Sequence, residues 1–253
     1  MSVFERIPVG KTSDDVAHQI EALVLEGILR VGEQLPSERD LAIETGVSRP
    51  VVREAIQLLE NRKILRRQQG GGTYVNDIIG QVFSDPIVEL LGHHKKATVD
   101  YLEYRREIES VATGFAAERA TKSDRELLEK IIEKMKQAHQ AANFDVEAQV
   151  DVEFHSLIGE MTHNLVLMHT LRSCYRLLSE GIIKNREQLY DTGGRQALFE
   201  QHMNIANAIL QGNKDAAIKA SRFHIDYILK RSAHVAMQLE RERIAGLRNK
   251  QRS

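Results

Sequence analysis

Four residues in the second half of the chain have types and spacing that suit a metal ion. Asp151 and His155 lie four positions apart in the segment DVEFH, so on a helix both side chains face the same way. His202 is expected to open a later helix, and His224 to lie mid-way along the last one. A carboxylate and three imidazoles that converge in a helical bundle could share one divalent ion. The opposite interpretation stays open, because the chain has ten histidines and any four are usually unrelated.

Two arginines near the start of a predicted helix could contact DNA. Arg49 and Arg53 are also four residues apart, in the segment GVSRPVVREAIQLLE. Ser48 is the expected N-cap of this helix, and Pro50 lies in its first turn, where a missing N–H costs nothing. Both arginines then share one face near the positive end of the helix, the end that reaches base edges in the major groove. The pattern predicts the recognition helix of a helix-turn-helix.

The neighbouring segments have the signals that this motif needs. A helix is predicted to begin at Ser13 and to run to about Glu26, and a short strand is possible at Gln34-Leu35. A second helix follows, with Ser37 as its N-cap and Gly46 beyond its end. After the recognition helix, two short extended runs flank a glycine-rich corner in ILRRQQGGGTYV, which predicts a β-hairpin wing. The recognition helix is expected to bury one face, formed by Val51, Ala55, Leu58 and Leu59.

Composition sets the broad class of the protein. With 253 residues, 42% of them hydrophobic, 28% charged and none tryptophan, the chain has the composition of a soluble globular protein with two domains. The net charge is only −1, but residues 39–69 carry seven basic and four acidic side chains, a local basic surface. The one cysteine, Cys174, excludes an internal disulfide and fits a reducing cytoplasm. No apolar run approaches the length of a membrane span or a signal peptide, so no membrane partner is expected.

The second half of the chain is predicted to be an antiparallel all-helical bundle, so that the fold as a whole is mainly α. Helical periodicity continues from about residue 98 onward, and no strand-like alternation interrupts it. Helices are expected at 98–120, from a capping box at Ser123 and Glu126 to about 142, at 145–162, at 165–190, and on either side of 211–213. The expected domains are 1–76 for DNA binding, 77–84 as a linker, 85–240 for metal and effector, and 241–253 as a charged tail.

The first 75 residues resemble the GntR family of bacterial transcription regulators. The segments LPSERDLA, GVSRPVVREAIQLLE and RQQGGGTYV occur in the family's order and at its distances. The resemblance implies a winged helix-turn-helix that binds double-stranded DNA. It also implies the DNA-contacting residues: Arg49 and Arg53 at the bases, Arg39, Ser48 and Pro50 at the backbone and groove, and Gln69 and Gly70 at the wing tip.

The second half resembles the FCD ligand-binding domain of FadR-type members of that family. Metal-binding members have an Asp-x3-His, a later His, and another about twenty residues on; Asp151, His155, His202 and His224 match in type and order. The resemblance implies an ion held by these four residues, Zn²⁺ or Ni²⁺, with coordination positions left open for a ligand. It also implies that an arginine in YLEYRREIES faces the ligand, here Arg105.

Arg106 is the adjacent candidate for this role, but the four-residue step to Glu109 favours Arg105, and Glu109 is interpreted as structural. The implied effector is a small organic acid, such as a 2-oxo, 2-hydroxy or sugar acid. The wing and lead-in sequences are most similar to members that respond to pyruvate or lactate.

The expected function is a repressor that a small carboxylate releases from DNA. A homodimer is expected, since a two-fold protein reads a palindromic operator. One alternative is a DNA-binding regulator with a purely structural metal, although such sites are often thiolate-rich and Cys174 has no second cysteine. The other is a metal-dependent hydrolase, but no general base accompanies the metal set, so an enzyme is not expected.

Overall fold

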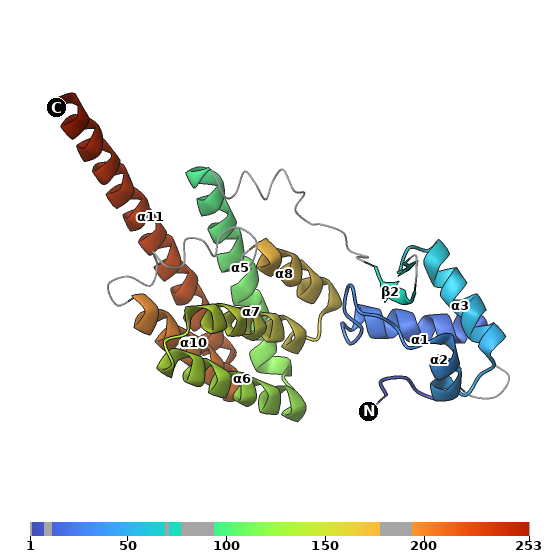
Figure 1. Cartoon of the computed structure of the whole chain (residues 1–253). Helices are drawn as coiled ribbons and strands as arrows, with labels where there is room; N and C mark the ends of the chain where they lie inside the picture. Colours follow the sequence, from blue (N-terminus) through green and yellow to red (C-terminus); the bar gives the residue numbers. More distant parts are fainter. Residues whose placement is uncertain (1, 8–11, 69–70, 77–93, 178–193, 253) are drawn as a thin grey trace. The chain divides into compact units, whose positions relative to one another are not determined.

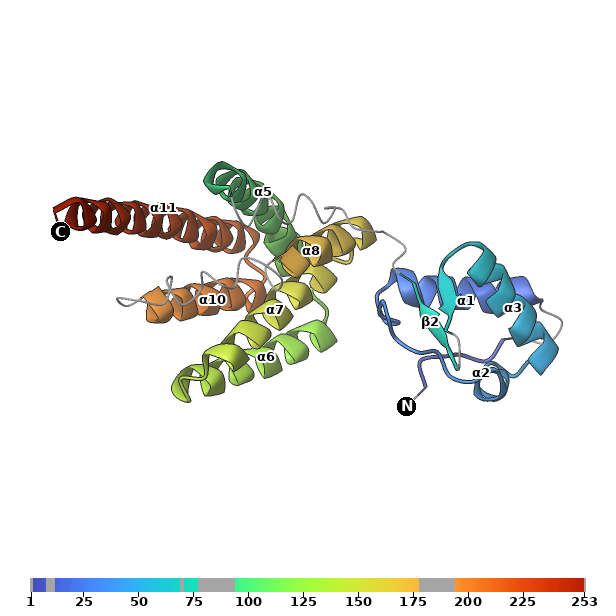
Figure 2. The same cartoon turned by 45° about the horizontal axis from the view of Figure 1, so that its top comes forward.

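In the computed structural model, the chain divides into two compact units, Met1–Gln81 and Val82–Ser253, each described here by itself. The structure describes residues 2–7, 12–68, 71–76, 94–177 and 194–252. Within these ranges the fold is mainly α-helical, with one small antiparallel sheet in the first unit (Figures 1 and 2). The predicted fold class is confirmed.

The first unit has three helices followed by a β-hairpin. Their bounds are α1 Ser13–Leu25, α2 Glu38–Thr45, α3 Arg49–Asn61, β1 Leu65–Arg67 and β2 Thr73–Val75. The N-cap of α1 is Thr12 rather than Ser13, because the Thr12 N–H donates to the Asp15 carboxylate at 2.9 Å and Ser13 already has helical geometry.

The turn between α2 and α3 depends on two local features. Ser37 caps α2 as predicted, since its hydroxyl accepts the Asp40 N–H at 3.2 Å. Gly46 ends α2 in the left-handed conformation, with φ of 75°, which a residue with a side chain adopts only with strain. Ser48 then takes the N-cap position of α3, with Pro50 in its first turn.

Two of the four residues predicted for the buried face of α3 lie at its edges. Val52, Ala55, Ile56 and Leu59 are buried, whereas Val51 and Leu58 are only half-buried at the edges of the same core. The buried positions follow the spacing i, i+3, i+4 and i+7 of a single helix face. Ala55 and Leu59 were assigned correctly.

The hairpin wing is confirmed in the part that the structure describes. Leu65 pairs with Val75 and Arg67 with Thr73, and the expected short strand at residues 34–35 is a single bridge from Gln34 to Tyr74. The backbone of Gly72 passes so close to Gln34 that an added Cβ would lie 2.5 Å from its side-chain nitrogen. The hairpin therefore packs against the chain segment before α2.

The second unit consists only of helices within its described residues. They are α5 Lys95–Arg119, α6 Lys122–Gln140, α7 Phe144–Met161, α8 Leu165–Leu177, α10 Gly194–Leu210 and α11 Lys214–Arg252. Phe154, which is fully buried, lies in a core cluster shared by α5, α6, α7, α10 and α11. In Figures 1 and 2, α11 lies along α5 and α10, and its C-terminal part extends beyond the other helices.

The start of α6 and the end of α11 differ from the expected positions. The capping box of α6 is formed by Thr121 and Asp124, not by Ser123 and Glu126, because the Thr121 N–H and hydroxyl both bond the Asp124 carboxylate, at 2.8 and 2.7 Å. Residues 241–252, expected as a charged tail, continue α11. The expected linker at 77–84 and the expected end of α8 near residue 190 lie outside the described residues.

None of the described helices combines the length and the apolar character that a membrane crossing requires.

Candidate metal centre and DNA-contacting surface

The structure brings the four candidate ligands together in the second unit. His155 lies on α7, His202 on α10 and His224 on α11, and one nitrogen of each lies within 4.8 Å of the others. The Nε2 atoms of His155 and His202 are 3.3 Å apart. Asp151 Oδ1 lies 3.1 Å from His202 Nε2 and 3.9 Å from His155 Nε2. All four residues are buried, none more than 6% exposed.

Local structure explains how the side chains meet. Asp151 and His155 share one face of α7, as their four-residue spacing predicted. His202 lies in the middle of α10 rather than at its start, because this helix already begins at Gly194. The ring of Phe154 stands edge-on to His155 and His202, with centroids 5.3 Å from each.

Two residues outside the ligand set hold the imidazoles. Glu109 Oε2 lies 3.4 Å from His155 Nδ1, and Gln201 Oε1 lies 3.0 Å from His224 Nδ1. Metal-binding histidines usually give one ring nitrogen to such a partner, which fixes the tautomer and leaves the other nitrogen for the ion. With Nδ1 engaged on both rings, Nε2 is the nitrogen that remains for a ligand.

The electrostatics of this cluster favour a neutral imidazole at His224. Burial, together with the neighbouring His202 and His155, holds the pKa of His224 well below its ordinary value. For Glu109, burial alone would raise the pKa, but Arg105 and His155 outweigh it, so the pKa is lowered and the carboxylate is charged. A neutral imidazole such as that of His224, with a charged carboxylate nearby, suits the binding of a divalent metal.

The donor set fits zinc or nickel. Three imidazole nitrogens and one carboxylate oxygen are common ligands of Zn²⁺, and imidazole also suits Ni²⁺. Ligands at about 2.0–2.1 Å from a tetrahedral zinc lie roughly 3.3 Å from one another. The 3.3 Å separation of His155 and His202 matches that spacing, and the 3.1 Å between Asp151 and His202 is close to it.

Arg105 lies beside the cluster, whereas Arg106 does not. The Arg105 side chain is 3% exposed, and its Nε donates to Glu109 Oε1 at 2.5 Å. Its guanidinium carbon lies 5.9 Å from the ring centre of Tyr101 and 6.0 Å from that of Tyr175. Burial would lower the pKa of Arg105, but Glu109 more than compensates and raises it, so the group stays charged.

Glu109, Gln201 and Tyr175 were not predicted as parts of this site. Glu109 was interpreted as structural, yet it joins Arg105 to His155; its spacing of four from Arg105 was the available signal. The ring of Tyr175 is tilted against the ring of His155, with centroids 5.4 Å apart. Nothing in the sequence distinguishes it or Gln201, because both reach the site only through the packing of helices far apart in the chain.

The candidate DNA-contacting residues of the first unit are exposed. Ser48, Arg49 and Pro50 are all exposed at the start of α3, and the Ser48 side chain makes no capping hydrogen bond. Arg39 on α2 has a side chain that is 72% exposed. Arg53 lies one turn beyond Arg49, and the wing-tip residues Gln69 and Gly70 lie outside the described residues.

Acidic side chains on the same surface pair with the arginines. Glu38 Oε2 accepts hydrogen bonds from Nε and Nη2 of Arg53, at 3.1 and 3.0 Å. Arg67, at the end of β1 next to the turn of the wing, lies 3.1 Å from Glu60 and 3.7 Å from Glu38. Glu38, which sequence reasoning did not select, therefore orients Arg53 from the preceding helix and approaches the wing.

Comparisons with known proteins agree with both halves of the molecule. Residues 12–75 match the model of the bacterial regulatory proteins of the gntR family, and residues 100–227 match the FCD domain. A protein of Escherichia coli K12 named for regulation of the L-lactate dehydrogenase operon is 34% identical, over 86% of this chain and 85% of its own length. The Glc operon transcriptional activator of Escherichia coli K12 is 31% identical, over 89% of each chain.

A solved structure supports the same assignment. A GntR protein of Streptococcus agalactiae is 29% identical and superimposes with a TM-score of 0.56, covering 86% of this chain and 99% of its own. Both domain types, their order and the full-length relatives point to one activity. The chain belongs to the GntR family of bacterial transcription regulators, as a DNA-binding regulator with a C-terminal FCD domain.

Proposed function

We propose that the protein is a repressor whose affinity for its operator is set by a small organic acid bound at a metal ion in the FCD domain. The observation that supports this most directly is the buried cluster of three histidines and Asp151, with the charged Arg105 beside it. A buried cation next to a metal site is suited to an anionic ligand.

Asp151, His155, His202 and His224 would hold the ion, and Glu109 and Gln201 would fix two of the imidazoles. Four ligands would fill a tetrahedral ion, so the effector requires zinc or nickel with more than four coordination positions, and the positions left open would attract carboxylate and hydroxyl or keto oxygens. The position of the acid would then be set by side chains of the protein next to the ion.

Arg105 would orient the effector. Its Nε is held by Glu109, which points the planar guanidinium fork in a fixed direction, and a carboxylate accepts two parallel hydrogen bonds from such a fork. A 2-hydroxy or 2-oxo acid has a carboxylate with an oxygen on the adjacent carbon, and a sugar acid offers the same pair. A relative that regulates an L-lactate dehydrogenase operon makes lactate the first acid to test.

The DNA-binding half of the proposal concerns the first unit. Arg49 and Arg53 would read base edges, Arg39, Ser48 and Pro50 would contact the backbone, and the tip residues Gln69 and Gly70 would enter the minor groove. We propose functional domains at 1–76 and 85–240. A homodimer would place two recognition helices on a palindromic operator. Binding of the acid would favour a state of the dimer whose recognition helices fit the operator less well.

The test begins with the metal and continues with the acid. Elemental analysis of protein purified without added ions should find about one zinc or nickel per chain. Thermal shifts with L-lactate, pyruvate, glycolate and gluconate should reveal an acid that stabilises the wild type but not Arg105→Ala. Arg172→Ala is the matched control, because Arg172 pairs with Glu160 at 2.7 Å in the same unit but makes no contact with the ligand cluster.

The same acid should then weaken binding to a palindromic operator fragment in fluorescence anisotropy. Stronger binding with the acid would contradict release and indicate a co-repressor or activator instead.

A purely structural metal is the second candidate, since the low exposure of all four ligands is typical of a closed site. It predicts metal in the protein but no acid that distinguishes wild type from Arg105→Ala.

A further inference from the structure

Helices α5 and α11 run antiparallel and are joined by contacts that recur at every turn. From one contact to the next, the residue number falls by four on α5 and rises by four on α11. The joined pairs are Glu118 with Lys214 at 3.0 Å, Gly114 with Ile218, Ser110 with Arg222 at 3.4 Å, and Arg106 with Asp226 at 2.6 Å. Such a repeat defines one axial register of the two helices.

The two helices lie close together at Gly114. A Cβ added there would lie 2.9 Å from two atoms of the Ile218 side chain, so a larger residue would require that side chain to move. The absence of a side chain at this one position lets the ion pairs on either side reach across.

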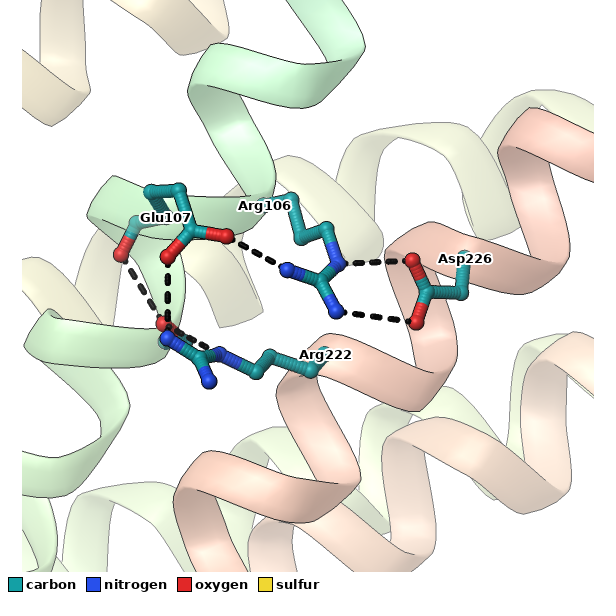
Figure 3. A network of polar contacts seen from close by, with 5 residues as sticks. Arg106, Glu107, Arg222 and Asp226 are labelled. Carbon is teal, nitrogen blue, oxygen red and sulfur yellow. Dashed lines mark hydrogen bonds and ion pairs between the residues drawn. The ribbon is translucent and has the colours of Figure 1, made fainter.

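At one end of this contact, four charged residues form a network that we name the clasp: Arg106 and Glu107 of α5 with Arg222 and Asp226 of α11 (Figure 3). Arg106 donates through Nε and Nη2 to both oxygens of Asp226, at 2.6 and 3.3 Å. Glu107 accepts from Arg106 at 2.5 Å and from Arg222 at 2.9 Å. A bidentate pair tied into a network restricts direction more than a single contact does.

The clasp lies on the outer side of α5, which carries Arg105, and of α11, which carries His224. His224 is two residues from both Arg222 and Asp226, and two residues turn a helix by about 200°, so His224 faces the opposite way. There it is 2% exposed and lies against the other ligands, whereas the Arg106 side chain is 31% exposed. Arg105, the proposed effector residue, precedes Arg106 on α5.

Because the clasp is exposed to water, it adds little to the free energy of folding. Its effect is on the axial register of α11. A slip of α11 by one turn would move His224 by about 5.4 Å, far more than a metal site tolerates. His224 is the one ligand that α11 supplies, so its place depends on the register of that helix.

We propose that Arg106, Glu107, Arg222 and Asp226 are positioning residues, which hold α11 in the register that presents His224 to the metal. The role rests on the proposed function, because it presupposes that His224 is a ligand.

The experiment measures zinc affinity of the full-length protein by competition with a chromogenic chelator. Asp226→Asn keeps the shape of the side chain but removes its charge, and it should lower the affinity by about tenfold or more, as the loss of a supporting residue does. The reversed pair, Arg106→Asp with Asp226→Arg, should recover most of this loss. Cobalt substitution adds a structural measurement, because a displaced His224 changes the visible absorption of bound Co²⁺.

The matched control is Glu118→Gln. It removes an ion pair between the same two helices, with Lys214, ten residues from His224. Its zinc affinity and cobalt spectrum should stay at wild-type values. If Asp226→Asn does not fold, Glu107→Gln, which removes only the bridge between the two arginines, gives the same measurement.

Three results would overturn the proposal. Folded Asp226→Asn with wild-type zinc affinity would show that the clasp does not position His224. An equal loss in Glu118→Gln would show that any weakening of the helix pair has this effect. A wild-type protein that binds no zinc, nickel or cobalt would refute the proposed metal site itself, and the clasp's role with it, an outcome distinct from the first two.

Discussion

The two candidate sites of this regulator contrast in how their residues are brought together. Arg49 and Arg53 lie one turn apart on the exposed surface of a single helix. The ligand cluster is buried, and its members come from three helices and from positions as distant as Asp151 and His224. A surface that reads DNA can be built from one local segment, whereas a site that excludes water requires the packing of a whole domain.

The contrast extends to the energetics of the charged groups. Arg53 is paired with Glu38 while its side chain is 61% exposed, so water and salt screen the pair and DNA can displace Glu38 at small cost. Arg105 and Glu109 are each 3% exposed, and breaking their pair would leave an uncompensated buried charge. The first unit should therefore adapt to its partner, and the second should hold a fixed geometry.

The largest expected effect is at the buried site. His202→Ala removes a ligand that touches both His155 and Asp151, so zinc affinity should fall by more than the roughly hundredfold that follows loss of an outer partner. Elemental analysis and chelator competition measure it. Full metal content in this variant would remove His202 from the ligand set. Operator affinity of the metal-free variant, measured in parallel, shows whether the metal is needed for DNA binding.

The next effect is at the exposed surface. Arg49→Ala should weaken binding to the cognate operator by about 1–3 kcal/mol and relax base preference at one position. Binding to a panel of operator fragments with single base changes measures both. Uniform weakening on all fragments would show that Arg49 contacts only phosphate. Metal content should stay at the wild-type level, since Arg49 lies in the other unit.

The affinities of the two sites should differ in their dependence on salt concentration. Operator affinity should fall steeply with salt, and Arg39→Ala should reduce the slope of log affinity against log salt concentration by about 1. Zinc affinity should change little over the same range, because buried charges are screened much less. A zinc affinity as salt-dependent as DNA binding would contradict the buried character of the cluster.

Removal of the N-cap of α6 should have the smallest effect, and it serves as a control for both sites. Thr121→Ala should lower the free energy of unfolding by about 1 kcal/mol, measured by urea denaturation, with metal and DNA affinity unchanged.

The contribution of this cap to the free energy of unfolding should depend on pH. Burial would raise the pKa of Asp124, but hydrogen bonds from Thr121 and the contact with His163 hold it below the ordinary value of 3.8. The carboxylate's contribution is therefore complete above that value and is lost as the pH falls through the lowered pKa. In Thr121→Ala the loss of stability between pH 5 and pH 3 should be smaller than in wild type.

The features of each site that depend on neighbouring residues in the chain could be predicted from the sequence. The recognition helix, its preceding turn and the wing follow from caps, glycines and apolar spacing, and the structure confirms them. The predicted buried face of α3 was wrong at Val51 and Leu58, since periodicity alone does not weigh Val51 against Val52. In the second unit the cap of α6 was assigned to Ser123, because Thr121 and Ser123 both precede an acidic residue by three positions.

The ligand types could be selected from spacing and family resemblance, but their supporting residues could not. Gln201 contacts His224 because α10 packs on α11, and Tyr175 contacts His155 because α8 packs on α7. Their sequence neighbourhoods contain nothing that distinguishes them from ordinary core positions. Long-range packing is the information that a linear pattern lacks.

The length of α11 would give the proposed metal site a mechanical output. The helix continues for 28 residues past His224 to Arg252, which at 1.5 Å per residue is a lever arm of about 42 Å. A tilt of roughly 5° about His224 would move the far end by about 4 Å. A small rearrangement among the proposed ligands would thus become a larger displacement at the C-terminal end of the helix.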